Sequence, residues 1–187
     1  MSEPYPYSDV LSPRVGNEHS ATIAGVDTRW WAFESADPSA RTIVMIHGYR
    51  GDHHGLQLFA DALPEFRVII PDLPSFGKSG TWPNGVTSIE QFGSWLREFL
   101  SVTNNSDAVV LGHSFGSIVV ANGLRGARTA PIVLVNPISQ KALNGPKKVL
   151  AALGSSWYVF GGLLPNSWGR AFLSWTPLVL VMSVLLA

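Results

Sequence analysis

Short apolar runs recur along the middle of the chain and alternate with longer segments of helical periodicity. The runs are rich in Val and Ile and too continuous for strands with one face in water, which is typical of parallel strands covered on both faces. The expected helices lie near residues 54–63, 88–101 and 115–127. The expected strands are Thr42–Ile46, Arg67–Ile70, Ala108–Leu111 and Ile132–Val135. This alternation predicts an α/β fold with a mostly parallel sheet and right-handed crossovers.

The chain on either side of this region has a different pattern. Residues 1–18 are polar and proline-rich, and we expect them to form a flexible arm. A β-hairpin is predicted next, with strands at Ser20–Ala24 and Thr28–Phe33 and a turn at Gly25–Asp27. From Pro137 onward Gly, Ser, Pro and Trp accumulate and the strand–helix alternation ends, which indicates a compositional boundary.

The overall composition fits one domain with a sizeable core. The 187 residues are 46% hydrophobic and 14% charged, whereas an average soluble domain is about 25% charged. The formal net charge is zero, so no overall field attracts nucleic acid or an anionic membrane. The absence of cysteine excludes disulfides and thiolate metal sites. The first ten residues lack the basic-then-apolar order of a signal peptide, so a cytoplasmic location is the default expectation.

The charged residues are unevenly distributed. All thirteen acidic residues lie at or before Asp107, and the residues after Ser114 include six basic ones but no Asp, Glu or His. Because a complete globular domain rarely lacks every acid over such a length, this asymmetry predicts that the chain is cut short.

The motif GHSFG at residues 112–116 follows an expected buried strand and opens an expected helix. In that context the pattern G-x-S-x-G predicts a tight strand-to-helix turn that projects the hydroxyl of Ser114 from the edge of the sheet. Side chains at Gly112 and Gly116 would collide with neighbouring backbone, so both positions need glycine. The N-terminus of the helix also offers free N–H groups to a developing negative charge. These features predict a nucleophilic serine.

The motif HGYRG at residues 47–51 follows the strand Thr42–Ile46. A loop at the carboxyl end of a neighbouring parallel strand can donate a backbone N–H toward the same point as the serine turn. Tyr49 and Phe115 are therefore the candidate donors of an oxyanion hole, whereas His47 is expected to be structural. A third motif, DLPSFGKS, begins at Asp72 and also follows a strand.

In their order and positions the three motifs resemble the α/β-hydrolase superfamily. HGYRG is similar to its oxyanion loop, with His47 and Gly48 as supporting residues, and GHSFG to its nucleophile elbow. DLPSFGKS is similar to its D-x-x-G-x-G-x-S turn, with serine at position 75 where glycine is common. The resemblance implies a three-layer fold of this type, incomplete at the C-terminus. Residues 19–136 would form the first part of the core and residues 137–187 the start of a truncated helical cap.

The resemblance also implies a Ser–His–acid triad that acts on an ester or related acyl substrate, without cofactor or metal. Ser114 matches the nucleophile and the amides of Tyr49 and Phe115 match the oxyanion donors, but no later residue matches the acid or the histidine. The position after the sixth strand, which carries the acid in some members, is Asn136. The sequence therefore predicts a chain with little or no hydrolytic turnover.

Two alternatives stay open beside the truncated hydrolase. The chain could be a binding protein that keeps the fold without chemistry, or a membrane-associated protein anchored by residues 171–187, a stretch of seventeen residues without charge. A spanning helix needs about 18 or more apolar residues, so the anchor is not favoured. Apolar aromatic residues in the tail instead suggest a cap over an apolar small-molecule substrate.

Three further histidines are expected to lie outside the chemistry. His113, next to the serine on a tight turn, is expected to point away from it. Asp52 is expected to cap a helix whose first turn carries His53 and His54. Because adjacent histidines face different directions on a helix, we expect no metal site there.

Overall fold

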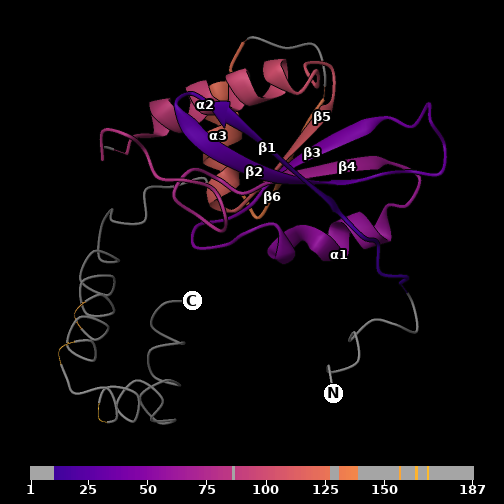
Figure 1. Ribbon diagram of the computed structural model, residues 1–187, viewed down its shortest axis with the longest axis horizontal. Helices are drawn as coiled ribbons and strands as arrows, with labels where there is room; N and C mark the ends of the chain where they lie inside the picture. The colour runs from indigo at the N-terminus through magenta and orange to yellow at the C-terminus, as the bar shows by residue number, and fades with distance from the viewer. Residues whose placement is uncertain are drawn as a thin grey trace. The chain divides into compact units, whose positions relative to one another are not determined.

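The computed structural model describes residues 11–85, 87–126 and 131–138 and the single positions 156, 163 and 168. The chain divides into two compact units, residues 1–138 and 139–187. In the first unit a six-stranded sheet lies between two layers of helix, with α2 and α3 on one face and α1 on the other (Figure 1). The predicted three-layer α/β fold with a mostly parallel sheet is confirmed.

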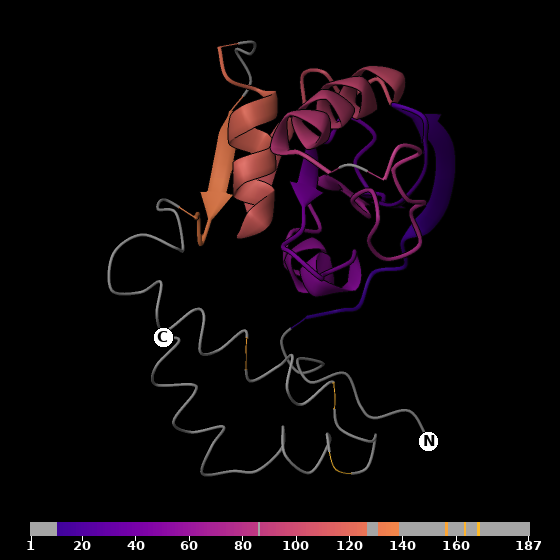
Figure 2. The same ribbon diagram turned by 90° about the vertical axis from the view of Figure 1, so that its left-hand side faces the viewer.

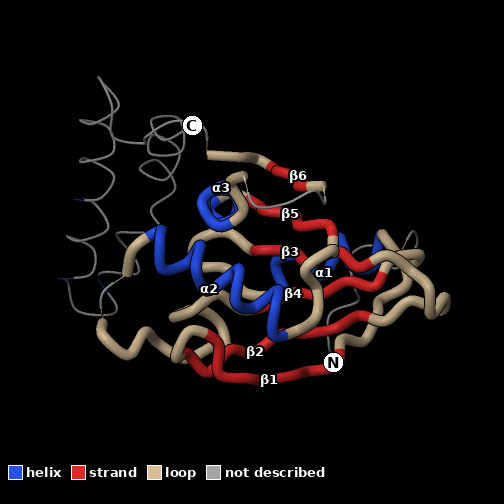
Figure 3. The backbone as a smooth tube through the Cα atoms, turned by 90° about the horizontal axis from the view of Figure 1, so that it is seen from above, coloured by secondary structure: helices blue, strands red, loops and turns tan. Residues whose placement is uncertain are grey.

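The sheet has the order β1-β2-β4-β3-β5-β6 (Figure 3). Its strands are β1 Asn17–Ile23, β2 Val26–Phe33, β3 Thr42–Ile46, β4 Arg67–Pro71, β5 Val109–His113 and β6 Ile132–Val135. The helices are α1 His54–Ala62, α2 Ile89–Val102 and α3 Phe115–Gly123. β1 and β2 are antiparallel to their neighbours, and β3, β4, β5 and β6 run parallel to one another. The loops that follow the parallel strands therefore meet at one edge of the sheet.

Alternate residues of β3 enter two separate hydrophobic clusters. Val44 and Ile46 pack in the cluster that contains Trp95 of α2 and Val120 of α3. Met45 packs on the opposite face, in the cluster that contains α1. Both faces of the central strand are thus buried, which explains why its sequence is a continuous apolar run rather than an alternating one.

The hairpin differs in register from the sequence prediction. β1 begins at Asn17 and β2 at Val26, so the turn contains only Ala24 and Gly25. Both turn residues have positive φ, 49° and 78°, which matches the right-handed twist of a two-residue hairpin. The predicted turn at Gly25–Asp27 is wrong because β2 already pairs with β1 at Val26 and Asp27.

Most other boundaries lie close to their predicted positions. β3 and β6 have the predicted bounds, and β4 is one residue longer than predicted. β5 runs on to His113, because that residue still pairs with Val135 in the β5–β6 ladder. α3 ends at Gly123 rather than near residue 127, since Gly126 has φ of 68° and cannot continue a right-handed helix.

The end of the predicted flexible arm is fixed to the core. The backbone N–H of Arg14 donates to the Asp61 carboxylate at 2.8 Å. The Arg14 guanidinium also donates to backbone carbonyls at the end of α1, at the end of β2 and just before β4: Ala60 and Leu63, Phe33 and Glu34, and Phe66. β1 then begins at Asn17. The expectation of a flexible arm does not hold for residues 14–18.

The predicted cap and the predicted membrane anchor lie almost wholly outside the described residues. Of residues 137–187 the structure describes 137 and 138 and the three single positions, and it describes none of the segment 171–187. Within the described part of the chain, no helix combines the length and the apolar character needed to cross a bilayer.

The Arg14 contacts predict a large stability cost for Arg14→Ala. A hydrogen bond to a charged group contributes about 1.5–3 kcal/mol to stability. In Arg14→Ala several backbone carbonyls lose such a donor at once. We expect Arg14→Ala to lower the free energy of unfolding by about 2–4 kcal/mol in urea titrations. Arg41→Ala is the control, because Arg41 is exposed. Equal stabilities of the two variants would show that Arg14 does not anchor this segment.

Candidate active site

Ser114 lies on a sharp turn between β5 and α3. Its backbone has φ of 51° and ψ of −116°, a conformation that L-residues rarely adopt, and its side chain is half-buried rather than sealed in the core. The Ser114 N–H donates to the carbonyl of Val135 at 3.0 Å. Strained backbone of this kind costs about 1–3 kcal/mol and persists only where the surrounding contacts hold it.

Glycines on both sides of Ser114 allow the turn to pack closely against the sheet. A Cβ added at Gly112 would lie 2.7 Å from the carbonyl oxygen of Gly116. A Cβ at Gly116 would collide with the carbonyl oxygen of Ile46 at the end of β3 and would lie 2.8 Å from that of His47. At both positions the added Cβ would meet backbone atoms, which cannot move aside as a flexible side chain could. Both positions therefore need glycine, as predicted.

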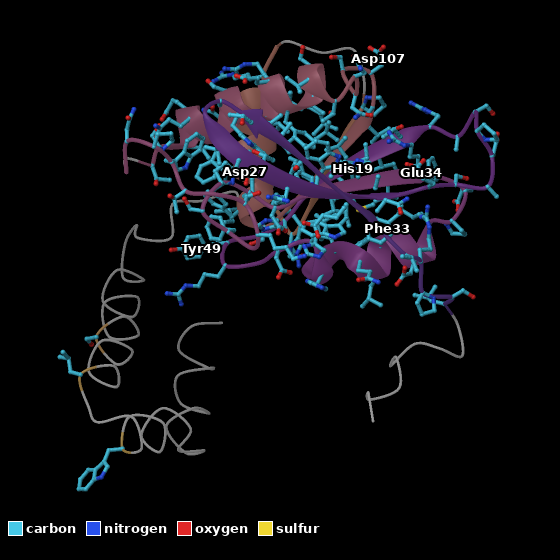
Figure 4. The ribbon with its side chains drawn as sticks, viewed as in Figure 1. His19, Asp27, Phe33, Glu34, Tyr49 and Asp107 are labelled. Atoms are coloured by element: carbon cyan, nitrogen blue, oxygen red, sulfur yellow. The ribbon has the colours of Figure 1, made fainter. Side chains whose placement is uncertain are left out.

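The loop at residues 47–51 lies beside the serine turn. A Cβ on Gly48 would lie 3.3 Å from Cβ and 3.7 Å from Oγ of Ser114. The Tyr49 side chain, at the rim of the site, is 66% exposed (Figure 4). Within the described residues, neither the Tyr49 N–H nor the Phe115 N–H donates a hydrogen bond to a protein group. The two candidate donors thus follow the adjacent strands β3 and β5, and neither N–H is engaged in a hydrogen bond among the described residues.

His47 is buried and holds this loop through both ring nitrogens. Nε2 accepts the Leu73 N–H at 2.9 Å, so the proton of the neutral ring is on Nδ1, which donates to the Gly48 carbonyl at 2.8 Å. Burial lowers the pKa of His47, against the opposing effects of the Gly48 carbonyl and Asp72. His47 is therefore a neutral structural residue that joins the 47–51 loop to the segment after β4.

Asp72, the first residue of the third motif, organises the neighbouring loop. Its fully buried carboxylate accepts the backbone N–H of His53 at 2.7 Å, lies 3.0 Å from Nδ1 of the same residue, and accepts the Lys78 N–H at 2.7 Å. A Cβ on Gly77 would collide with this carboxylate. Ser75 adopts φ of 70°, which explains why glycine is common at that position of the motif.

The described histidine rings make contacts that do not include a hydrogen bond to Ser114 Oγ. Besides His47, His53 pairs with Asp72 and stacks on Trp31, His54 lies 3.3 Å from Asp52, and His19 stacks on Trp30. The described part of the chain therefore shows no general base in contact with the serine.

His113 and Ser114 both lie near the 47–51 loop. The His113 Nδ1 and the Ser114 Oγ lie 3.5 and 3.7 Å from a Cβ built on Gly48. Both residues line one small pocket. No hydrogen bond joins the two side chains in the described structure, and the direction of His113 relative to Ser114 stays a prediction.

The predicted divergence of the two adjacent histidines is wrong. The ring centroids of His53 and His54 are 3.9 Å apart. His53 lies at the N-cap of α1, where its ring contacts Asp72 and stacks on Trp31. Candidate ligand atoms of Asp52, His53 and His54 lie within 4.8 Å of one another, so these side chains could approach a common ion. The Asp72 carboxylate already occupies Nδ1 of His53, and the N-terminus of α1 disfavours a cation.

Two adjoining pockets lie over the turn. The smaller, about 210 Å³, is lined by Gly48, His113 and Ser114 among others. The larger, about 760 Å³, shares Tyr49, Gly51 and Asp52 with it. Aromatic and aliphatic side chains form much of its wall: Tyr49, Phe76, Ile89, Phe92 and Phe115. Four of these rings contact one another edge to face, so the wall is a continuous aromatic surface.

Comparison with known proteins relates this arrangement to one family. The model of the alpha/beta hydrolase family matches residues 43–185, which is most of the chain. The chain belongs to the alpha/beta hydrolase family. The suspected resemblance is confirmed, as is the fold class that it implies.

Individual relatives of this alpha/beta hydrolase are distant. The dihydrolipoyllysine-residue acetyltransferase component of an acetoin cleaving system from Cupriavidus necator is 28% identical over 136 residues, which are 72% of this chain and 31% of that protein. The chain thus spans about a third of this curated relative. The structure of the Cif epoxide hydrolase from Acinetobacter nosocomialis has a TM-score of 0.63, with 17% identity, and the match covers 79% of this chain and 49% of the other. An N-acyl homoserine lactonase has a TM-score of 0.60 at 21% identity, covering 83% and 63%.

Sequence reasoning found the turn and the loop but missed Ser117, whose buried hydroxyl donates to the carbonyl of Ser114 at 2.5 Å. The signal in the sequence was a polar residue three positions after the serine, on the expected buried face of a helix.

The contact at Gly116 predicts that Gly116→Ala is strongly destabilising. The added methyl group would enter the backbone of β3, so we expect the free energy of unfolding to fall by about 2–4 kcal/mol. Gly55→Ala is the matched control, because a Cβ at this position in α1 meets nothing within 4 Å. It should leave stability unchanged or raise it by up to about 1 kcal/mol. Chemical denaturation measures both, and a tolerated Gly116→Ala would contradict the observed packing.

The lowered pKa of His47 predicts a loss of stability in mild acid. The folded state binds a proton on His47 less readily than the unfolded chain, so the contribution is complete above about pH 6.5 and is lost as the pH falls below that value. His47→Gln should show a flatter dependence of unfolding free energy on pH between about 7.5 and 5.5 than the wild type. His19→Gln, at an exposed position, should keep the wild-type slope. Equal slopes for wild type and His47→Gln would contradict the burial of a neutral ring.

Proposed function

We propose that the protein is a serine hydrolase of the esterase type, with Ser114 as its nucleophile. The observation that carries the proposal is the half-buried Ser114 side chain on a turn with φ of 51°, beside the loop at residues 47–51. A serine held there projects its hydroxyl toward the carboxyl ends of β3 and β5, where a substrate carbonyl can approach. Serine at this position also disfavours those reactions for which hydrolases of this fold use a carboxylate nucleophile.

The amides of Tyr49 and Phe115 would stabilise the tetrahedral intermediate. Both N–H groups are free of protein acceptors in the described structure, and Phe115 is the first residue of α3, where the helix dipole favours negative charge. An oxyanion bound by two such donors is stabilised in the transition state more than the substrate carbonyl is, and loss of one donor typically costs about 100- to 1000-fold in rate.

The aromatic wall of the larger pocket supports an apolar ester or related acyl compound as substrate. Phe76, Phe92 and Phe115 offer ring surface in the pocket that adjoins the one lined by Ser114, and the charged side chains of its wall are Arg50 and Asp52. A pocket of this kind favours an apolar acyl or alcohol group, and no cofactor is needed for acyl transfer to serine and then to water. The lactonase relative, whose name denotes hydrolysis of a cyclic ester, is consistent with this substrate class.

The chain alone is expected to have little turnover. No Asp, Glu or His follows Ser114 in the sequence, and none of the described histidines is hydrogen-bonded to its hydroxyl. Without a base the serine is a weak nucleophile, and loss of a triad member commonly lowers kcat by about 10⁴- to 10⁶-fold. The same observation favours a second candidate function, a binding protein that uses the pocket without chemistry.

Prolonged treatment with a fluorophosphonate distinguishes the two functions. We expect slow modification confined to Ser114, because a positioned hydroxyl faces two oxyanion donors but lacks a base. Peptide mapping by mass spectrometry locates the adduct, and Ser114→Ala is the control. Absence of any adduct at Ser114 would favour the binding protein.

Turnover provides the complementary measurement. Hydrolysis of p-nitrophenyl butyrate by the wild type should lie within about tenfold of Ser114→Ala, since no described histidine is hydrogen-bonded to the Ser114 hydroxyl. Rapid stoichiometric labelling of Ser114 together with turnover well above Ser114→Ala would overturn the expectation of an inactive chain, and would require a base that the described residues do not show.

A further inference from the structure

We propose that Ser117 is a positioning residue that aims the Phe115 amide into the oxyanion site. The inference rests on the proposed oxyanion role of the Phe115 amide. In it, Ser117 sets the direction of the Phe115 N–H without contacting the substrate. Ser117 is the third residue of α3 and is only 3% exposed.

The carbonyl of Ser114 receives two hydrogen bonds from this one residue. The Ser117 N–H donates to it at 2.9 Å, which closes a tight first turn of the helix, and the Ser117 hydroxyl donates to it at 2.5 Å. The hydroxyl is itself fixed, because Oγ accepts the N–H of Ile138 at 3.2 Å. The donor of the hydroxyl and one of its acceptor sites are therefore both used, and its rotation is restricted.

The Ser114 carbonyl and the Phe115 N–H belong to the same peptide group. This group is planar and trans, so its C=O and N–H point in opposite directions. Fixing the carbonyl toward Ser117, inside the helix end, directs the Phe115 N–H away from Ser117. Ser114 has φ of 51° and ψ of −116°, and ψ sets the plane of this peptide, so the plane is not held by an ordinary backbone minimum and depends on such contacts.

Two hydrogen bonds join the turn and the start of α3 to the end of β6. Ser114 donates to Val135, the last residue of β6, and Ile138, which follows β6, donates to Ser117. Figure 2 shows β6 and α3 side by side at this end of the sheet. Ser117 is the only hydroxyl-bearing side chain among the described residues that links the Ser114 peptide to this segment.

Three variants separate a positioning role from general stability. Ser117→Ala removes the hydroxyl, and Ser117→Thr retains it. The control is Thr28→Val in β2, because the buried Thr28 hydroxyl also donates to a backbone carbonyl and accepts an N–H. It donates to Val26 and accepts the indole N–H of Trp95. Ser117→Ala and Thr28→Val should therefore lower the thermal midpoint by similar amounts.

The direction of the Phe115 N–H is measured by its residual dipolar coupling in a weakly aligned NMR sample. We expect the coupling to change in Ser117→Ala and to stay at the wild-type value in Ser117→Thr and Thr28→Val. The rate at which excess fluorophosphonate modifies Ser114 should fall at least about tenfold in Ser117→Ala and less than about threefold in the other two variants.

An unchanged Phe115 coupling in Ser117→Ala overturns the inference, whatever the labelling rate, and so does a change of the same size in Thr28→Val. A Phe115 coupling that changes in Ser117→Ala alone supports the inference, even if Ser114 of the wild type cannot be labelled. Failure to label wild-type Ser114 would count against the proposed function instead. If Ser117→Thr is too crowded to fold, the comparison of Ser117→Ala with Thr28→Val still decides between positioning and stability.

Discussion

The site depends on one close contact between two stretches of backbone, the approach of Gly116 to the carbonyls of Ile46 and His47. This approach presses the turn after β5 against the end of β3, so that the loop leaving β3 has to pass beside Ser114. It also leaves no room for a relaxed strand-to-helix connection, and the backbone of Ser114 adopts a strained conformation with φ of 51°. Ser114 is held in that conformation because its N–H donates to the Val135 carbonyl and its own carbonyl accepts hydrogen bonds from Ser117. Close backbone packing together with the Ser117 hydroxyl thus holds a half-buried serine in a fixed conformation.

Much of this arrangement could be predicted from the sequence, because it follows from local patterns with a direct physical cause. Buried runs such as Thr42–Ile46 define parallel strands, and glycines on either side of a serine between a strand and a helix define the turn. The predictions failed where long-range contacts decide. Arg14 is anchored by carbonyls from three distant segments, which no local pattern reveals. His53 and His54 come together because His53 is drawn to Asp72 and Trp31. Ser117 was missed because its role lies in a bond to the backbone of Ser114.

The features used in the proposed function come from one continuous part of the chain. The turn, the neighbouring loop and the aromatic wall are built from residues 43–116, inside the region that matches the family. The buried histidine of the loop, His47, is used up in holding the Gly48 carbonyl and the segment after β4, which explains why it is unsuited to proton transfer from the serine. In the proposed function, the described residues would supply positioning and electrostatic stabilisation, and they show no base for proton transfer from the serine.

The central claim is that the Ser114 hydroxyl faces amides from both the turn and the 47–51 loop. The crystal structure of the protein after phosphonylation of Ser114 tests it most directly, because the adduct carries an oxygen where the oxyanion would form. The account predicts that this oxygen lies about 2.7–3.1 Å from the backbone nitrogens of both Tyr49 and Phe115. An adduct whose oxygen points to solvent, or contacts neither nitrogen, would contradict it.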